Sequence, residues 1–471
     1  MLRFLEISNN TLFAYYLISD LIYLCLLASA IYTTAIHKRR LASIRFASLK
    51  ASPLTPPISV LVPAHNEEMT IVESVRSLLS LDYPELEVIV INDGSTDQTL
   101  EELIRHFRLL QTDLLYIPEI PTHPVRAIYM SQDDRRLLVV DKEWGRSKAD
   151  CINAGLNAAS SPYICVVDAD AVLENDALLR IMGPVLTDPR RVIAAGGIVR
   201  VANGSRIKGG ELPEVRLPRR PLEILQVVEY LRAFLIGREG WAHFNMLTII
   251  SGAFGVFRRD VVRKIGGFRV SAIGEDIDLV IHLHRHLRQQ KEDYQIAFIP
   301  DPVCWTEAPA DLKSLGRQRA RWQKGLFDVL WRNRDMVFNP RYGRIGWVAI
   351  PYLWIFELFA PVIELVGYTT MIVAGLLGVL SREFFFGFLL FGYAFATLIS
   401  IGSVLQEELT YRRYNDWRDV IRLIIFCFLE HFPYRQLQMF WRFRGIQHYL
   451  QGDVTWGQLQ REGFQPGPEL K

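Results

Sequence analysis

The sequence predicts an α/β fold, with a doubly wound and mainly parallel sheet in a domain inserted between transmembrane helices. In the middle of the chain, short β-branched runs alternate with helical patterns, and this alternation is typical of parallel sheets. Toward both ends the chain becomes apolar. Residues 12–35, for example, hold one charged side chain, Asp20. The 471 residues are enough for one or two domains with hydrophobic cores.

The predicted sheet is built from apolar runs that are each followed by a helical pattern. The predicted strands are residues 58–63, 86–92, 137–141 and 163–168, and the predicted helices are residues 66–81, 96–107, 148–158 and 175–186. In such sheets, ligands bind outside the carboxyl ends of the strands. Polar side chains at these ends, Asp93 and Asp168 among them, are therefore the first candidates for a functional site.

The N-terminal apolar stretch is long enough to cross a bilayer core of about 30 Å. Its positive charges, at residues 37–40 and then at Arg45 and Lys50, follow the apolar run. A signal peptide carries them before it, so the stretch is predicted to be an uncleaved anchor. The positive cluster predicts a cytoplasmic domain after the anchor and an N-terminus outside the cell membrane.

The C-terminal half holds further apolar segments. Residues 343–380 include Pro351 and Pro361 and are too long for one upright crossing, so they predict either a kinked or interfacial piece with one span, or two spans. A second apolar run covers 384–405, and residues 419–432 fit an interfacial amphipathic helix. Three or five crossings follow, both with a cytoplasmic C-terminus.

Two acidic side chains, Glu357 and Glu364, share a helical face inside the apolar run. Ionisable groups there are costly and face protein or a water-filled path. They are predicted either to pair with Arg or Lys or to line a polymer conduit.

Together these patterns divide the multi-pass chain into four parts. They are an anchor with a basic linker (1–53), a cytoplasmic catalytic domain (54–325), interfacial and transmembrane helices (326–435) and a cytoplasmic tail (436–471).

Composition excludes several classes of protein. Lys and Arg number 53 against 51 Asp and Glu, and this balance argues against a nucleic-acid partner. The five cysteines are scattered and form no CxxC pair, so neither a zinc site nor a disulfide framework is predicted. The domain is therefore expected to face a reducing compartment.

The segment Asp168-Ala169-Asp170 places two carboxylates just after a predicted strand. A nucleotide diphosphate would be repelled by bare carboxylates, and a divalent cation between them removes this repulsion. Mg²⁺ suits one or two carboxylates together with phosphate oxygens, and it also neutralises a departing diphosphate.

Two further acidic segments have a functional and a structural interpretation. Asp93, in residues 92–95, either contacts the base or ribose of a nucleotide-sugar donor or caps a helix. In residues 274–278, Asp276 is the candidate base that deprotonates an acceptor hydroxyl. The alternative, structural interpretation is a helix N-terminus, whose dipole favours acidic residues such as Glu275 and Asp278.

The last segment is Gln318-Arg319-Ala320-Arg321-Trp322. On a helix, Gln318, Arg321 and Trp322 share one face, where Arg can clamp a diphosphate and Trp can stack on an acceptor sugar. A juxtamembrane amphipathic helix is the alternative. Lys148 either meets phosphate or is solvated, and residues 305–307 are expected to help line the acceptor site.

Taken in order, these segments resemble the family 2 glycosyltransferases, and among them the membrane-bound processive synthases that make cellulose, chitin, hyaluronan and poly-N-acetylglucosamine. The matching segments are VPAHNEE (62–68), INDGSTD (91–97), KADCINAGL (148–156), VVDADA (166–171), ISGAFGVFRRDVV (250–262), GEDIDL (274–279) and QRARWQKG (318–325). Residues 456–461 resemble the tail of the poly-N-acetylglucosamine branch. One departure is Asn92, where relatives carry a second Asp.

The resemblance implies a GT-A fold, a Rossmann-like α/β domain, and it implies roles for individual residues. Asp276 is the catalytic base. The donor-binding residues are Asp93, Lys148, Asp168, Gln318, Arg321 and Trp322; Glu275 and Trp322 bind the acceptor; and Asp170 with Asp168 holds Mg²⁺ or Mn²⁺.

The expected activity is inverting, metal-dependent transfer from a UDP-sugar, with UDP-N-acetylglucosamine as the first candidate, to a growing polysaccharide that is exported. Membrane lipids and accessory export subunits are the further expected partners. The alternatives are transfer of one sugar to a lipid-linked acceptor and a non-catalytic subunit that binds nucleotide sugar.

Overall fold

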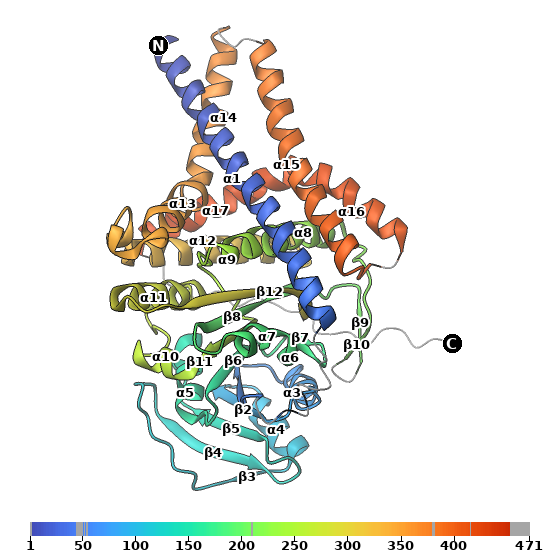
Figure 1. Cartoon of the computed structure of the whole chain (residues 1–471), viewed down its shortest axis with the longest axis vertical. Helices are drawn as coiled ribbons and strands as arrows, with labels where there is room; N and C mark the ends of the chain where they lie inside the picture. Colours follow the sequence, from blue (N-terminus) through green and yellow to red (C-terminus); the bar gives the residue numbers. More distant parts are fainter. Residues whose placement is uncertain are drawn as a thin grey trace. The chain divides into compact units, whose positions relative to one another are not determined.

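A computed structural model of the chain describes residues 2–43, 50, 52, 55–208, 211–378, 382–414 and 416–452 (Figure 1). The chain divides into two compact units, whose positions relative to one another are not determined. The sheet unit contains the described residues of 37–218 and 244–308. The helical unit contains the described residues up to 36, residues 219–243 and the described residues from 309 onward. The segment 456–461 lies outside the described residues.

The sheet unit is built on a ten-stranded sheet of order β3-β4-β5-β2-β1-β6-β11-β8-β12-β7 among the described residues. The strands are β1 (Ile58–Ala64), β2 (Leu86–Asp93), β3 (Leu109–Gln111), β4 (Val125–Ser131), β5 (Leu137–Lys142), β6 (Tyr163–Val167), β7 (Val172–Leu173), β8 (Val192–Val201), β11 (Phe254–Arg258) and β12 (Gln295–Thr306). A separate hairpin joins β9 (Arg206–Lys208) to β10 (Glu211–Glu214).

The sheet is mixed, which corrects the prediction of a mainly parallel one, whereas the α/β class is confirmed. Strands β5, β2, β1 and β6 are parallel neighbours, as the alternating pattern predicts. Strand β11 then runs antiparallel between β6 and β8, and β4 and β3 extend the other edge in antiparallel fashion. Strand β12 pairs parallel to β8 and antiparallel to β7.

The helices of the sheet unit are α3 (Ile71–Leu79), α4 (Thr99–Phe107), α5 (Lys148–Ala158), α6 (Ala177–Ile181), α7 (Gly183–Thr187), α10 (Arg259–Lys264) and α11 (Glu275–Gln290). Helix α3 begins five residues later than predicted because Asn66 has a left-handed backbone, with φ of 58°. The predicted helix 175–186 is interrupted at Met182, just before Gly183 and Pro184.

The helical unit contains the apolar segments. Its helices are α1 (Leu2–Ser43, which continues into the sheet unit), α8 (Pro221–Leu231), η1 (Arg232–Arg238), α9 (Glu239–His243), α12 (Leu312–Arg332), η2 (Arg334–Met336), η3 (Pro340–Tyr342), η4 (Ile345–Ala349), α13 (Ile350–Tyr352), η5 (Leu353–Leu358), α14 (Ala360–Leu376), α15 (Arg382–Thr410), α16 (Trp417–Leu429), η6 (Glu430–Tyr434) and α17 (Arg435–Leu450). Leu26, Ile236 and Ile399 pack α1, η1 and α15 into one buried apolar cluster.

Among the described residues, two helical segments are long and apolar enough to cross a membrane, Asn10–Arg39 and Leu390–Thr410. A helix pair bent by 46°, Ile345–Leu358 with Ala360–Leu376, gives a third candidate if it is one span. Of the two predicted counts of crossings, three corresponds to this arrangement. The orientation across a membrane stays a prediction.

The acidic pair of the apolar run meets arginines of α17. Arg442 lies 3.2 Å from the Glu357 carboxylate, and Arg435 lies 3.1 Å from that of Glu364. Glu357 belongs to η5 and Glu364 to α14, on the two sides of the 46° bend, so the predicted single helical face is interrupted, although both carboxylates pair with arginines of α17. This supports the structural interpretation of the two glutamates.

Candidate active site

Charged residues gather at the carboxyl edge of the parallel strands. Asp93 is the last residue of β2, Lys142 is the last of β5, and Asp168 follows β6 directly. Because β5, β2, β1 and β6 are parallel neighbours, these residues lie at the same edge of the sheet. This is the edge at which α/β sheets bind ligands.

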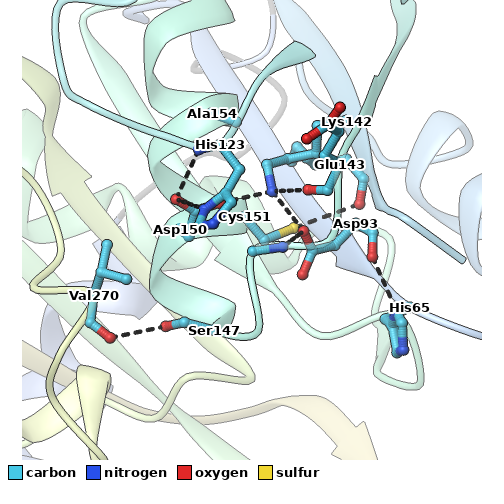
Figure 2. Close-up of polar contacts among 12 residues, drawn as sticks. His65, Asp93, His123, Lys142, Glu143, Ser147, Asp150, Cys151, Ala154 and Val270 are labelled. Atoms are coloured by element: carbon cyan, nitrogen blue, oxygen red, sulfur yellow. Dashed lines mark hydrogen bonds and ion pairs between the residues drawn. The ribbon is translucent and has the colours of Figure 1, made fainter. Parts of the chain in front are cut away.

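A buried lysine holds the Asp93 carboxylate (Figure 2). Lys142 is fully buried and its Nζ donates to Asp93 at 2.5 Å, while the Gly145 N–H donates to the same oxygen at 2.9 Å. The lysine Nζ also lies 2.6 Å from the Asp150 carboxylate. Asp93 is thus fixed by two donors, and the sequence pattern gave no signal for Lys142 because a lysine at a strand end is normally solvated.

The charges of this network support one another. Burial alone would lower the pKa of Lys142, but its hydrogen bonds to Asp150 and Asp93 raise the pKa above its usual value. Burial would likewise raise the pKa of Asp150, whereas hydrogen bonds from Lys142 and His123 hold it below its usual range. His123 reaches Asp150 Oδ1 through its backbone N–H at 3.1 Å. The lysine therefore stays charged between two carboxylates.

An aromatic surface lies next to Asp93. The His65 Nδ1 is 2.8 Å from the Asp93 carbonyl oxygen (Figure 2). The His65 ring stacks on Trp144, with ring centroids 5.5 Å apart and planes 10° apart. Trp144 is 51 % exposed. A Cβ at Gly94, whose φ is +59°, would lie 2.7 Å from the backbone nitrogen of Trp144, so this turn requires glycine. Sequence reasoning identified neither aromatic residue.

Asn92, the departure from the family pattern, has a partner of its own. Its side-chain amide donates to Asp141 Oδ1 at 2.7 Å, and both residues are buried. An aspartate at position 92 would set two carboxylates against each other here. The substitution is thereby explained within the sheet.

A second group of charges surrounds Gly252. The Lys148 Nζ forms an ion pair with Asp168, lies 3.8 Å from Glu275 Oε1 and donates to the Gly252 carbonyl oxygen at 3.2 Å. A Cβ at Gly252 would come within 3.0 Å of that Nζ. The structure thus brings together Lys148, Asp168 and Glu275, three residues that the sequence predicted for the site.

The group around Gly252 perturbs its own members. Burial raises the pKa of Glu275 to about 7; Lys148 opposes this shift, and Asp276 and Asp168 add to it. For Lys148, burial would lower the pKa, but Asp168, Glu275 and Asp276 together raise it above its usual value. A carboxyl group with a pKa near neutrality beside a fixed cation is typical of catalytic sites.

The three acidic residues at the start of α11 differ in their surroundings. Asp276 follows Glu275 in the first turn, where its carboxylate accepts the Ile277 N–H at 2.8 Å. Asp278 is buried and pairs with Arg269 at 2.9 Å. Its role is therefore structural, whereas Asp276 and Glu275 lie next to the Gly252 group.

The predicted metal ligands fit a hard divalent cation in chemistry. Asp168 and Asp170 flank the buried Ala169 in the turn after β6, and both offer the oxygen ligands that Mg²⁺ and Mn²⁺ take. Within the residues described, no group of three or more His, Cys, Asp or Glu side chains is placed to hold a metal ion. Further ligands would therefore have to come from substrate or water.

The remaining predicted residues lie on α12, in the helical unit. Trp322 is 46 % exposed, and Gln318 and Arg321 are half-buried. Gln318 and Trp322 both contact Arg319 between them, so the structure brings these two together. The roles of Gln318, Arg321 and Trp322 in binding donor and acceptor stay predictions.

Trp305 is not available to an acceptor, which corrects its predicted role. The apolar pattern predicts a strand over residues 296–300, but β12 continues to Thr306, so Trp305 lies inside the sheet and is fully buried. Its indole N–H donates to Glu174 at 3.3 Å.

Two sequence-family models match the chain. Residues 59–119 match the family "Glycosyl transferase family 2", and residues 125–325 match "Glycosyltransferase like family 2". These matches include the Asp93, Lys142 and Gly252 groups, and the second extends through Trp322.

Curated relatives include poly-β-1,6-N-acetyl-D-glucosamine synthases of two staphylococci. The poly-β-1,6-N-acetyl-D-glucosamine synthase of Staphylococcus epidermidis is 30 % identical over 278 residues, covering 59 % of this chain and 56 % of the relative. The synthase of that name in Staphylococcus aureus strain COL is 29 % identical over 305 residues, covering 64 % and 62 %. The matched part of the chain thus spans less than two thirds of either relative.

Among solved structures, a mannosyltransferase from Pyrobaculum calidifontis in complex with GDP-Man and Mn²⁺ aligns at 20 % identity and a TM-score of 0.47, covering 88 % of this chain and 99 % of that one. Glucosyl-3-phosphoglycerate synthase from Mycobacterium tuberculosis aligns at 20 % identity and a TM-score of 0.38, covering 61 % and 84 %. With TM-scores below 0.5, neither similarity assigns a fold or a ligand.

Proposed function

Because the chain belongs to the family 2 glycosyltransferases, we propose that it transfers a sugar from a UDP-sugar to the growing end of a polysaccharide. The observation that carries this proposal is the charged group of Lys148, Asp168 and Glu275 around Gly252, directly beside Asp276. The name of the staphylococcal relatives, poly-β-1,6-N-acetyl-D-glucosamine synthase, supports a polysaccharide product and makes UDP-N-acetylglucosamine the first donor to test.

The group around Asp93, with Lys142, Gly145 and Trp144, is the proposed site of the nucleotide. The Asp93 carboxylate, oriented by Lys142 and the Gly145 N–H, is an acceptor for an N–H of a base or a ribose hydroxyl. The exposed Trp144 supplies an adjoining flat surface for stacking. Lys148 contributes a cation for the donor's phosphates, since it starts α5 at the same edge of the sheet.

Asp170 and Asp168 are the proposed ligands of Mg²⁺ or Mn²⁺. When bound, such an ion neutralises charge on a departing diphosphate. Their oxygen chemistry and their place after β6 support this assignment.

The proposed chemistry is a single inverting displacement. Asp276 accepts the proton of the acceptor hydroxyl while its oxygen bonds to the anomeric carbon, and the bond from that carbon to the diphosphate oxygen breaks. Glu275, buried with a pKa of about 7, contacts the acceptor next to the base. Gln318 and Arg321 bind the donor diphosphate, and Trp322 stacks on the acceptor sugar.

The candidate spans support a location in the cell membrane. In this proposal, residues 54–325 are the cytoplasmic catalytic domain, the N-terminus is outside, and the product leaves through the membrane helices with or without accessory export subunits. Exposed apolar residues on one face of α16, Trp417, Ile421 and Ile425, support contact of that helix with lipid.

The test is release of UDP by the purified full chain, supplied with a panel of UDP-sugars and Mg²⁺ or Mn²⁺. We expect turnover with UDP-N-acetylglucosamine and a polymeric product that grows with time. A lipid carrying one sugar would replace the polymer claim with the lipid-acceptor alternative. Absence of UDP release with every donor would reject the proposed activity.

A further inference from the structure

The α12 helix carries a buried cation behind its exposed face. Arg319 is 3 % exposed, although it stands between the half-buried Gln318 and the exposed Trp322 in the sequence. A buried guanidinium is costly unless it is paired and hydrogen-bonded. The partners of Arg319 therefore determine where its planar group can lie.

Glu229 of α8 supplies that pairing. Its Oε2 accepts three hydrogen bonds, from Arg319 Nη2 at 2.9 Å, from Tyr434 Oη at 2.7 Å and from Gln438 Nε2 at 2.8 Å. The donors come from α12, η6 and α17, all of the helical unit. One carboxylate oxygen thus fixes the guanidinium relative to two other segments.

The far side of the guanidinium touches two of the predicted substrate-binding side chains. Arg319 Nη1 donates to Gln318 Oε1 at 3.1 Å, and the guanidinium carbon lies 4.3 Å from the centroid of the Trp322 ring. A cation at this distance from a ring is attracted to its face. The orientation of both side chains is therefore coupled to that of Arg319.

Packing between α12 and α17 keeps this support in place. A Cβ at Gly316 of α12 would lie 2.7 Å from the Trp441 indole nitrogen, so the two helices approach as closely as glycine allows. Gln323 of α12 also accepts from Arg442 Nε of α17 at 2.8 Å. Gln438, which holds Glu229, belongs to that same α17.

We propose that Glu229 is a positioning residue, which sets the Trp322 indole and the Gln318 amide through Arg319. The indole that Glu229 positions is the stacking surface for the acceptor sugar, and this second part rests on the proposed function. When Glu229 is neutralised, the Arg319 guanidinium loses its ion pair and can adopt other orientations. The Trp322 indole then loses its fixed orientation, whereas the residues of the donor site in the sheet unit are unchanged.

The positioning itself is tested without any activity measurement. The full chain, which has ten tryptophans, is produced with 5-fluorotryptophan and purified in detergent. The ¹⁹F signal of Trp322 is the one that disappears in the Trp322→Phe variant. We expect Glu229→Gln and Arg319→Lys to shift or broaden this ¹⁹F signal. Glu223→Gln, a matched change of a buried glutamate on α8, should leave it in place. An unmoved signal in both variants would overturn the proposal.

The consequence for the acceptor is tested by kinetics with a defined oligosaccharide. We expect the acceptor KM to rise about fivefold in Glu229→Gln and about tenfold in Arg319→Lys, whereas the donor KM should rise less, through the Gln318 amide that Arg319 also contacts. In a Trp322→Ala background, Glu229→Gln should add no further change in the acceptor KM. Equal losses with and without Trp322 would mean that Glu229 acts on the fold alone. If the wild-type chain transfers no sugar, the proposed function fails, and the ¹⁹F signals still decide the positioning.

Discussion

The carboxyl edge of the sheet and the exposed face of α12 use opposite means to hold their functional groups. At the sheet edge, Lys142 and Lys148 each lie between two carboxylates. The functional groups there are therefore held by ion pairs and are largely buried. On α12, the groups offered to a ligand are an exposed indole and a half-buried amide. Only their support, the ion pair of Arg319 with Glu229, has a buried cation.

This difference predicts different kinds of damage. Removing one partner of a buried charge pair leaves an uncompensated charge, which costs several times more than losing a contact on an exposed aromatic face. Substitutions at the sheet edge should therefore abolish chemistry, donor binding or folding. Substitution of Trp322 on the α12 face should weaken acceptor binding and leave the chemistry, donor binding and folding intact.

The largest effect is expected for Asp276→Asn. The amide cannot accept the acceptor's proton, so we expect kcat to fall about 10³-fold while the donor still binds. The rate of UDP release measures kcat, and calorimetric titration with the nucleotide measures donor binding. Full turnover in this variant would remove Asp276 from the role of base.

Lys142→Met should be the most damaging change outside the catalytic base. It leaves Asp93 and Asp150 buried without their cation, at an expected cost of about 3–5 kcal/mol in the free energy of unfolding. Thermal unfolding of the full chain in detergent measures this. Lys50→Met is the matched control, since Lys50 pairs with Asp82 at the exposed surface. Similar melting temperatures for the two variants would contradict the structural role given to Lys142.

Glu275→Gln should change how stability depends on pH. The folded pKa of Glu275 is about 7 against an ordinary 4.5, so the folded state binds its proton more tightly. Its stabilising contribution is therefore complete below pH 4.5 and is lost as the pH rises through 7. Charges facing it are Lys148, Asp168 and Asp276. We expect the melting temperature of the variant, relative to wild type, to increase from pH 5 to pH 8. Parallel curves would show that Glu275 is not perturbed.

The smallest effect belongs to the α12 face. Trp322→Ala removes a stacking surface, and we expect the acceptor KM to rise about tenfold with little change in the donor KM. Initial rates at varied acceptor and donor concentrations separate the two. A comparable rise in the donor KM would erase the proposed contrast between the two regions.

The sequence pattern predicted the parallel core of the sheet well. Strands β1, β2, β5 and β6 are largely apolar runs, so their ends could be located, and with them Asp93 and Asp168. Strands β8 and β11 were missed because glycines interrupt their apolar pattern. A Cβ at Gly197 would collide with the Phe254 ring. Because these two strands pack so closely, they need glycine at positions where a β-branched residue would have indicated a strand.

The supports of the site were harder to predict than its presented residues. Acidic residues after strands point to a site because strand ends converge. Lys142 and Glu229, in contrast, act through partners 49 and 90 residues away in sequence. No local pattern marks such pairs, and each looks like an ordinary charged residue on a strand end or helix. Only the fold identifies them.

The most direct test of the account is the product made by the purified full chain from labelled UDP-N-acetylglucosamine with Mg²⁺ or Mn²⁺. The account predicts release of UDP and a labelled polymer that lengthens with time, and neither from Asp276→Asn. A labelled lipid bearing a single sugar, or equal product from wild type and Asp276→Asn, would contradict it.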